Sequence, residues 1–165
     1  MAAFNGELME YCSKNGVIQT AEVPMQPGVS LSKTDCPDTP EAAAKLKHLR
    51  YPQLVGSLLY LVEASRHDLK VAVGNCAKFM SNFGMPHWLA ALHILRFLMK
   101  YPKMEVVFEY SEDGEGLILM YECDSAYADC PDTRRSRYGF LGFLAGGVIV
   151  AKTAMFKSVM PSTGA

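Results

Sequence analysis

The hydrophobic pattern of this chain changes its period once, close to residue 103, and this change limits the possible folds more than any other feature. Before it, apolar residues recur at the three- and four-residue spacing of helices. After it, apolar and polar residues alternate as in strands. A chain that is helical first and strand-rich later is typical of the α+β class. Its 165 residues suffice for one domain, or for a small domain with part of a second.

Three helices are expected within about residues 52–101. Apolar residues at helical spacing occupy 54–62, 72–80 and 88–99, and three such stripes can be buried against one another. Asp68 is a candidate N-cap for the second helix, and Pro102 ends the third.

Two ring side chains open the third helix. We expect Trp88 to pack in the core and His87 to lie near solvent. The remaining histidines are scattered, and no pair of them has the spacing of metal ligands.

The first 50 residues are expected to form an irregular, linker-like segment. Four prolines between residues 22 and 50 and little periodicity leave room for one helical turn at Glu41–Leu46, after a short helix at residues 7–14. Lys45–Arg50 is locally basic, which a solvated face and a contact with RNA explain equally.

The second part of the chain is expected to be a mainly antiparallel sheet. Alternation predicts a half-buried strand at 104–110, and the three later runs are apolar and bounded by turn residues. The later strands are expected at Leu117–Tyr121, Gly139–Ala145 and Val148–Ala151, with turns at Asp113-Gly114, Pro131-Asp132 and Gly146-Gly147.

Composition argues against several classes of protein. The net charge is −1, so the basic surplus of most free-standing nucleic-acid-binding proteins is absent, and such a role must rest on a local patch. No apolar run approaches the roughly 20 residues of a membrane span. The five cysteines lack CxxC spacing and no signal sequence precedes them, so we expect reduced thiols and an intracellular protein.

Asp124 is the first candidate site residue. It directly follows an apolar strand run, where a carboxylate can face a ligand, and metal-dependent nucleases use several such carboxylates. A carboxylate that forms a turn or a cap explains the same position.

Arg134 and Arg135 are the other candidates. Their guanidinium groups could clamp a phosphate in the loop 132–136, and a solvated hairpin organised by Asp132 is the alternative.

Nine segments of this sequence resemble copia-type retrotransposon Pol polyproteins, in that family's order and at about its spacing. They are Val23–Met25, Leu31–Lys33, Tyr51–Leu61, Arg66–Leu69, Phe79–Asn82, His87–Leu98, Cys130–Ser136, Gly139 and Phe143–Gly147. Each is modest alone, but so many in one order make chance an implausible explanation. The resemblance covers nearly the whole chain, from about Glu7 onward.

The resemblance implies a place in a longer enzyme. In that family the corresponding region joins the reverse-transcriptase core to an RNase H domain, which cuts the RNA strand of an RNA–DNA hybrid with two Mg²⁺ ions. It implies a linker-like segment at 1–50, a helical connection segment of three helices at 51–102, and the first strands of a truncated RNase H-like fold at 103–165. Asp124 matches the first acidic metal ligand. Arg134 and Arg135 match the loop to the second strand, as does Ser136.

The sequence also departs from that family's pattern. Ala126 occupies the next acidic position, His67 replaces a proline between Arg66 and Asp68, and Pro161 falls where a strand residue is expected. The family's catalytic Glu is absent from the final Ser162–Ala165. We therefore expect a Pol remnant that binds no Mg²⁺ stably, has no activity alone, and self-associates through an incompletely covered sheet.

Two other hypotheses remain open. One is a domesticated module that binds a protein or a nucleic acid. The other is an active nuclease completed by another chain. The partners implied by the family are the RNA–DNA hybrid and the rest of the polyprotein, with no membrane.

Overall fold

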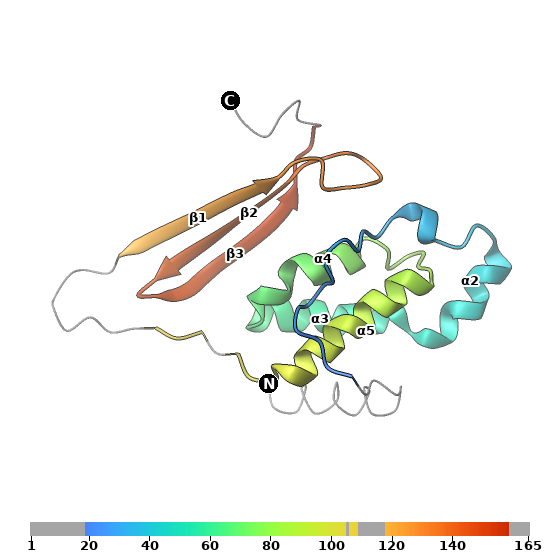
Figure 1. Ribbon diagram of the computed structural model, residues 1–165, viewed down its shortest axis with the longest axis horizontal. Coiled ribbons are helices and arrows are strands. Elements are labelled where there is room, and N and C mark those ends of the chain that lie inside the picture. The colour runs from blue at the N-terminus through green and yellow to red at the C-terminus, as the bar shows by residue number, and fades with distance from the viewer. Residues whose placement is uncertain (1–18, 105, 109–117, 159–165) are drawn as a thin grey trace. The chain divides into compact units, whose positions relative to one another are not determined.

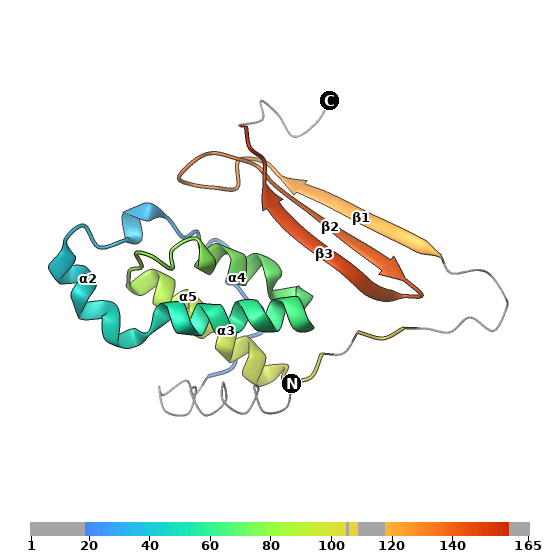
Figure 2. The same ribbon diagram turned by 180° about the vertical axis from the view of Figure 1, so that it is seen from behind.

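The computed structural model describes residues 19–104, 106–108 and 118–158. They belong to two compact units, Met1–Met104 and Glu105–Ala165, and each unit is treated by itself. The first unit contains helices α2 to α5 and the second contains the three-stranded sheet β1–β3, so the α+β class is confirmed (Figures 1 and 2). Among the described residues, no helix is both long enough and apolar enough to cross a membrane.

The three expected helices are present as α3 (Tyr51–Ala64), α4 (Lys70–Ala77) and α5 (Met85–Lys100). They pack on one another through the predicted apolar stripes. The expected turn at 41–46 is also present, as α2 (Pro40–Leu46), which begins where the Thr39 hydroxyl accepts a hydrogen bond from the Ala42 N–H at 3.3 Å. Short 3₁₀ turns η1 (Lys33–Asp35), η2 (Lys47–Leu49) and η3 (His67–Leu69) connect these elements.

Aromatic side chains are buried in the core of the helical unit and pack its helices together. Tyr51 is fully buried, stacks on Phe83 with 4.6 Å between ring centroids, and donates its hydroxyl to the Cys76 carbonyl at 2.8 Å. Trp88 is buried as predicted. The hydroxyl bond ties the first turn of α3 to the last turn of α4, so burying this polar group also fixes how the two helices pack.

His87 does not lie near solvent, and the expectation that it would was wrong. Its ring is fully buried, lies 4.1 Å from the Phe79 ring between centroids, and accepts a hydrogen bond from the Gly84 N–H at 2.9 Å through Nδ1. The ring satisfies one of the N–H groups at the start of α5, where a solvent-facing residue had been expected.

Asp68 does not cap α4 through its side chain, because the N-cap of that helix is Leu69. The Asp68 carboxylate binds Arg66 instead, with Nε–Oδ1 and Nη2–Oδ2 distances of 2.9 and 2.8 Å. Competition from a guanidinium two residues earlier therefore explains why the expected cap was wrong.

The segment that precedes α2 is irregular over most of its described length, yet it is anchored to the helices. The Ala21 N–H donates to the Arg96 carbonyl at 3.2 Å, and His93 Nε2 lies 3.0 Å from the Val23 carbonyl oxygen. Leu31 is buried in the core of the unit. This arm therefore adds hydrogen bonds to α5 and an apolar side chain to the core, which its prolines did not predict.

The second unit is an antiparallel meander in the order β1 (Leu119–Ala126), β2 (Arg137–Leu144) and β3 (Gly147–Met155). Strands β2 and β3 are joined by a two-residue turn at Ala145-Gly146, with φ of +49° and +74°. Positive φ at both positions defines the type I′ turn that suits the twist of a hairpin. The expected strands near 117–121, 139–145 and 148–151 are therefore confirmed, with different ends.

The strand expected at 104–110 is not found at the described positions 104 and 106–108. Alternation reports which side chains are apolar, but a strand also needs a neighbour for its backbone, and β1, β2 and β3 pair with one another here. The Phe108 ring instead lies so close to Gly147 that a Cβ there would approach it to 2.5 Å. The predictions for residues 7–14, Tyr110, Asp113-Gly114 and Pro161 lie outside the described residues.

Candidate functional site

Asp124 lies inside β1 and not just beyond its end, as had been expected. Strand pairing continues through Ala126, and Asp124 is directly opposite Gly139 of β2. The side chain is exposed, and Oδ1 accepts a hydrogen bond from the Ser125 N–H at 2.7 Å. A carboxylate at this place stays hydrated in the free protein and is accessible to a ligand from solvent.

One face of β1 carries two carboxylates. Because side chains alternate along a strand, Glu122 and Asp124 share a face, and the next position on that face is Ala126, opposite Arg137. Within the described ranges, no group of three or more His, Cys, Asp or Glu residues is placed to hold a metal ion. The described donors therefore do not make up a two-metal site, and the metal role of Asp124 stays a prediction.

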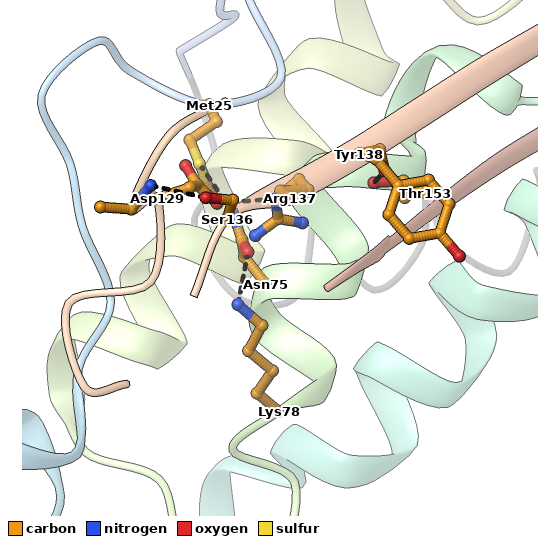
Figure 3. Close-up of polar contacts among 9 residues, drawn as sticks. Met25, Asn75, Lys78, Asp129, Ser136, Arg137, Tyr138 and Thr153 are labelled. Atoms are coloured by element: carbon orange, nitrogen blue, oxygen red, sulfur yellow. Dashed lines mark hydrogen bonds and ion pairs between the residues drawn. The ribbon is translucent and has the colours of Figure 1, made fainter. Parts of the chain in front are cut away.

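The loop between β1 and β2 is held by the buried Ser136. Its hydroxyl accepts a hydrogen bond from the Ala128 N–H at 3.1 Å, and its carbonyl accepts one from the Phe156 N–H at 2.9 Å (Figure 3 draws the first). The Arg134 N–H donates to the Cys130 carbonyl at 2.8 Å inside the loop. Ser136 thus ties both ends of the meander together, a structural role for a residue that the family resemblance placed in this loop.

An ion pair braces the same loop. Arg137 Nε donates to Asp129 Oδ2 at 2.7 Å, and the arginine side chain is largely buried (Figure 3). This pair was not predicted from the sequence. The only sequence feature that indicates it is a pair of opposite charges eight residues apart across a predicted turn. Many residues that form no ion pair have the same spacing.

Arg134 and Arg135 are both exposed at the tip of this loop, and Arg134 has a φ of +55°. Neither guanidinium has a hydrogen bond or an ion pair with another described residue, and no contact joins either of them to Asp124 in that part of the chain. The geometry leaves both side chains accessible to an anion. Their role in binding phosphate stays a prediction.

A second polar cluster lies in the helical unit and was missed from the sequence. Arg66 is 3% exposed, forms the two-bond pair with Asp68, and donates from Nη1 to the Tyr101 carbonyl at 2.7 Å. Its guanidinium also lies 5.7 Å from the centroid of the Phe97 ring. Arg66 therefore fixes the C-terminal end of α5 against the chain that leads into α4.

Burial changes the titration of two groups in the same unit. It raises the pKa of the Tyr51 phenol far above the ordinary value, and the nearby Cys76 adds to this effect. It also raises the pKa of the Cys76 thiol to about 11, against a lowering contribution from the Tyr51 hydroxyl. The thiol therefore stays protonated at neutral pH. None of the four described cysteines forms a disulfide.

Comparisons with known proteins give two transposon proteins. The chain is 34% identical over 140 residues, 85% of its length, to the retrovirus-related Pol polyprotein from transposon TNT 1-94 of Nicotiana tabacum. It is 27% identical over 111 residues to the putative transposon Ty5-1 protein of Saccharomyces cerevisiae. The matched region is 10% of the tobacco polyprotein and 35% of the yeast protein.

A third relative is of similar size. The chain is 30% identical over 118 residues, 72% of its length, to the secreted RxLR effector protein 161 of Plasmopara viticola, and covers 81% of that protein. No protein-family model matches the chain. No solved structure matches it either. Similarity to a transposon Pol polyprotein over most of the chain, supported by the yeast transposon protein, shows that the chain belongs to the retrotransposon Pol polyproteins and matches part of their length.

Proposed function

We propose that this chain is the part of a Pol polyprotein that follows the reverse-transcriptase core and leads into an RNase H-like domain. The observation that carries the proposal is the place of Asp124, exposed on the first strand of an antiparallel meander that follows a helical unit. The proposed division is a segment at 1–50, a helical connection at 51–102 and RNase H-like strands from 103 onward.

The number of metal ligands that RNase H cleavage needs bears on whether the chain is active by itself. Two-metal cleavage holds two cations roughly 4 Å apart, and several anionic ligands are needed because the cations repel each other. Asp124 and Glu122 share one face of β1, and Ala126 supplies no ligand at the next position. The proposal is therefore that the chain alone does not cut an RNA–DNA hybrid and binds Mg²⁺ no more than weakly.

A cleavage assay tests this proposal. The purified chain is incubated with a hybrid labelled on its RNA strand, with Mg²⁺ or Mn²⁺, beside the Asp124→Asn variant. No cleavage is expected from either. A second pair carries the segment that follows the matched region in the tobacco polyprotein, and there cleavage that depends on Asp124 is expected. RNA cleavage by the original chain that Asp124→Asn abolishes would contradict the proposed inactivity. Equal RNA cleavage by the extended chain with and without Asp124→Asn would contradict the RNase H assignment.

A second candidate is a stand-alone module that binds a protein or a nucleic acid. The observation in its favour is that a protein named as a secreted effector is matched over 81% of its own length by this chain. A region of this size therefore occurs in a protein that is not named as a polymerase. Its test is whether hybrid binding by the chain is unchanged by Asp124→Asn while the extended chain shows no cleavage.

A further inference from the structure

The charge of the chain is unevenly distributed, although its net charge is only −1. Residues 19–104 contain ten lysines and arginines but six aspartates and glutamates. All four histidines lie in the same range. The helical unit therefore carries a positive excess that the whole-chain value hides, and its location decides what the unit can attract.

Ion pairs remove part of this excess from consideration. Arg66 is paired with Asp68, Lys70 with Glu63 at 2.9 Å, and Lys100 with Glu22. Each of these pairs cancels a positive charge with a negative one. Of the seven lysines and arginines outside these pairs in residues 19–104, three lie in one six-residue stretch, 45–50.

That stretch, here called the basic corner, consists of Lys45, Lys47, His48 and Arg50. It lies where the chain passes from α2 through η2 into α3 (Figures 1 and 2). All four side chains are exposed. None of the four is in an ion pair with another described residue. Glu41 is four residues before Lys45 on α2, a spacing that often gives a pair, and no such pair forms between these two described residues.

The backbone of the basic corner is well defined. His48 Nδ1 lies 2.7 Å from the Lys45 carbonyl oxygen, and the Arg50 N–H donates to the Lys47 carbonyl at 3.3 Å. Arg50 adopts a left-handed conformation with φ of +51°, and Tyr51 directly after it is fully buried. The corner is therefore a fixed turn anchored on the core, so less conformational entropy is lost when its cations meet a ligand.

The surroundings of the corner select among anionic partners. Proteins that attach to anionic membranes combine basic residues with apolar side chains that enter the lipid. Among the described residues, no exposed large apolar side chain lies between Val29 and Tyr60 in the sequence. An exposed turn whose charged side chains are all cationic suits the regularly spaced phosphates of a nucleic acid, which are bound through charge at the surface.

We infer that the basic corner is a second nucleic-acid contact, which binds the sugar-phosphate backbone of the hybrid in addition to any contact that Asp124 makes. This inference rests on the proposed function, because it takes the RNA–DNA hybrid as the ligand. Its contacts are independent of sequence, because phosphates carry no base information. Binding through three permanent cations should fall with salt, with a slope of about 0.9 per phosphate neutralised.

The test is hybrid binding by the full chain, followed by fluorescence anisotropy at several salt concentrations. The variant Lys45→Gln/Lys47→Gln/Arg50→Gln removes three charges from the corner. The matched control Lys33→Gln/Lys78→Gln/Lys103→Gln removes three charges from exposed lysines elsewhere in the same unit. Helical circular dichroism checks that both variants remain folded.

The corner variant is expected to lower the salt slope by about 3. Three phosphate contacts change the affinity by a factor of about 40 between 50 and 200 mM salt. The corner variant should therefore lose this part of the salt dependence. The control should retain most of the slope. Equal weakening of both variants, or no effect of either, would overturn the inference.

Binding to phosphatidylserine vesicles or to polyglutamate in preference to the hybrid would also overturn it. These results are separate from the cleavage assay, so the corner can fail while cleavage that depends on Asp124 in the extended chain still supports the proposed function.

Discussion

Arg66 fixes the C-terminal end of α5 through its buried guanidinium group. Replacing it with Met keeps much of the aliphatic stem but leaves the Asp68 carboxylate and the Tyr101 carbonyl without their donor. Because the guanidinium is almost fully buried, we expect Arg66→Met to lower the free energy of unfolding by about 2–4 kcal/mol. Urea unfolding followed by circular dichroism measures this change.

The control for Arg66 is the exposed pair between Lys70 and Glu63, whose carboxylate side chain is 69% exposed. Glu63→Gln should cost less than about 1 kcal/mol, because water screens that pair. If Arg66→Met lowers the free energy of unfolding no more than Glu63→Gln does, the buried two-bond pair stabilises the fold no more than an exposed ion pair.

Cys76 and Tyr51 give the helical unit a dependence on alkaline pH. The folded-state pKa of the Cys76 thiol is raised from an ordinary value near 9 to about 11, so above about pH 9 the unfolded chain loses this proton first. The stability that is fully present below about pH 9 is therefore lost as the pH rises toward 11, by up to about 1.4 kcal/mol per pH unit for each such group.

The measurement is urea unfolding of three chains between about pH 8 and pH 10.5, a range that brackets the titration of free thiols. The unfolding free energy of Cys76→Ala should fall less steeply with pH than that of the parent. Cys123→Ala removes an exposed thiol and should keep the parent slope. Parallel curves for Cys76→Ala and the parent would contradict the assignment.

The residues that the sequence misplaced share one physical cause. His87 and Asp68 are polar residues beside apolar stripes, and local pattern does not say whether a partner from another element will satisfy them. Gly84 and Phe79 bury His87, and Arg66 takes Asp68 away from the helix start. Trp88 was predicted correctly, because a large apolar ring has one favourable environment whichever element covers it.

The elements were more predictable than their ends. The spacing of 3.6 identified α3 and α5, since buried helices of 14 and 16 residues leave a long periodic record. Strand β1 continues past its apolar run through polar residues as far as Ala126, because pairing with β2 and not hydrophobicity sets its end. For the same reason Asp124 was recognised as a strand-linked carboxylate but placed just beyond the strand.

Gly142 of β2 tests how closely the three strands pack. A Cβ at this position would lie 2.5 Å from Val150 Cγ1 and 2.8 Å from the Tyr121 ring, both on neighbouring strands. Gly142→Ala must displace one of them, so we expect a loss of about 1–3 kcal/mol in the stability of the sheet. Thermal unfolding followed by the strand signal in infrared spectra measures it.

Gly139 on the same strand is the matched control. There a Cβ would meet only the Lys152 carbonyl oxygen, at an ordinary 3.5 Å. Gly139→Ala should therefore be neutral or slightly stabilising, because alanine restricts the unfolded chain. If Gly142→Ala and Gly139→Ala lower the stability of the sheet equally, the close packing of Tyr121 and Val150 on Gly142 does not determine that stability.

At the scale of the whole molecule, the two units differ in how much apolar surface they leave in water. The helices bury their stripes, whereas every residue of β1 is exposed and its side away from β2 has no strand partner among the described residues. The apolar residue Ile118 directly precedes this strand, the apolar residues 119–121 open it, and each of the four is more than half exposed. An exposed apolar edge strand is a template for pairing with another chain.

We therefore expect the isolated chain to self-associate at micromolar concentrations through β1, with light scattering that rises with concentration. Met120→Lys places a charge in the middle of the apolar run and should reduce the association, since a charge on an edge strand must lose water when another strand pairs with it. Tyr60→Lys makes a comparable change at the exposed Tyr60 of α3, in the other unit, and should leave association unchanged. Sedimentation velocity on all three chains decides the matter. A monomer at every concentration, or equal relief by both lysines, would show that β1 is not the surface through which the chain associates.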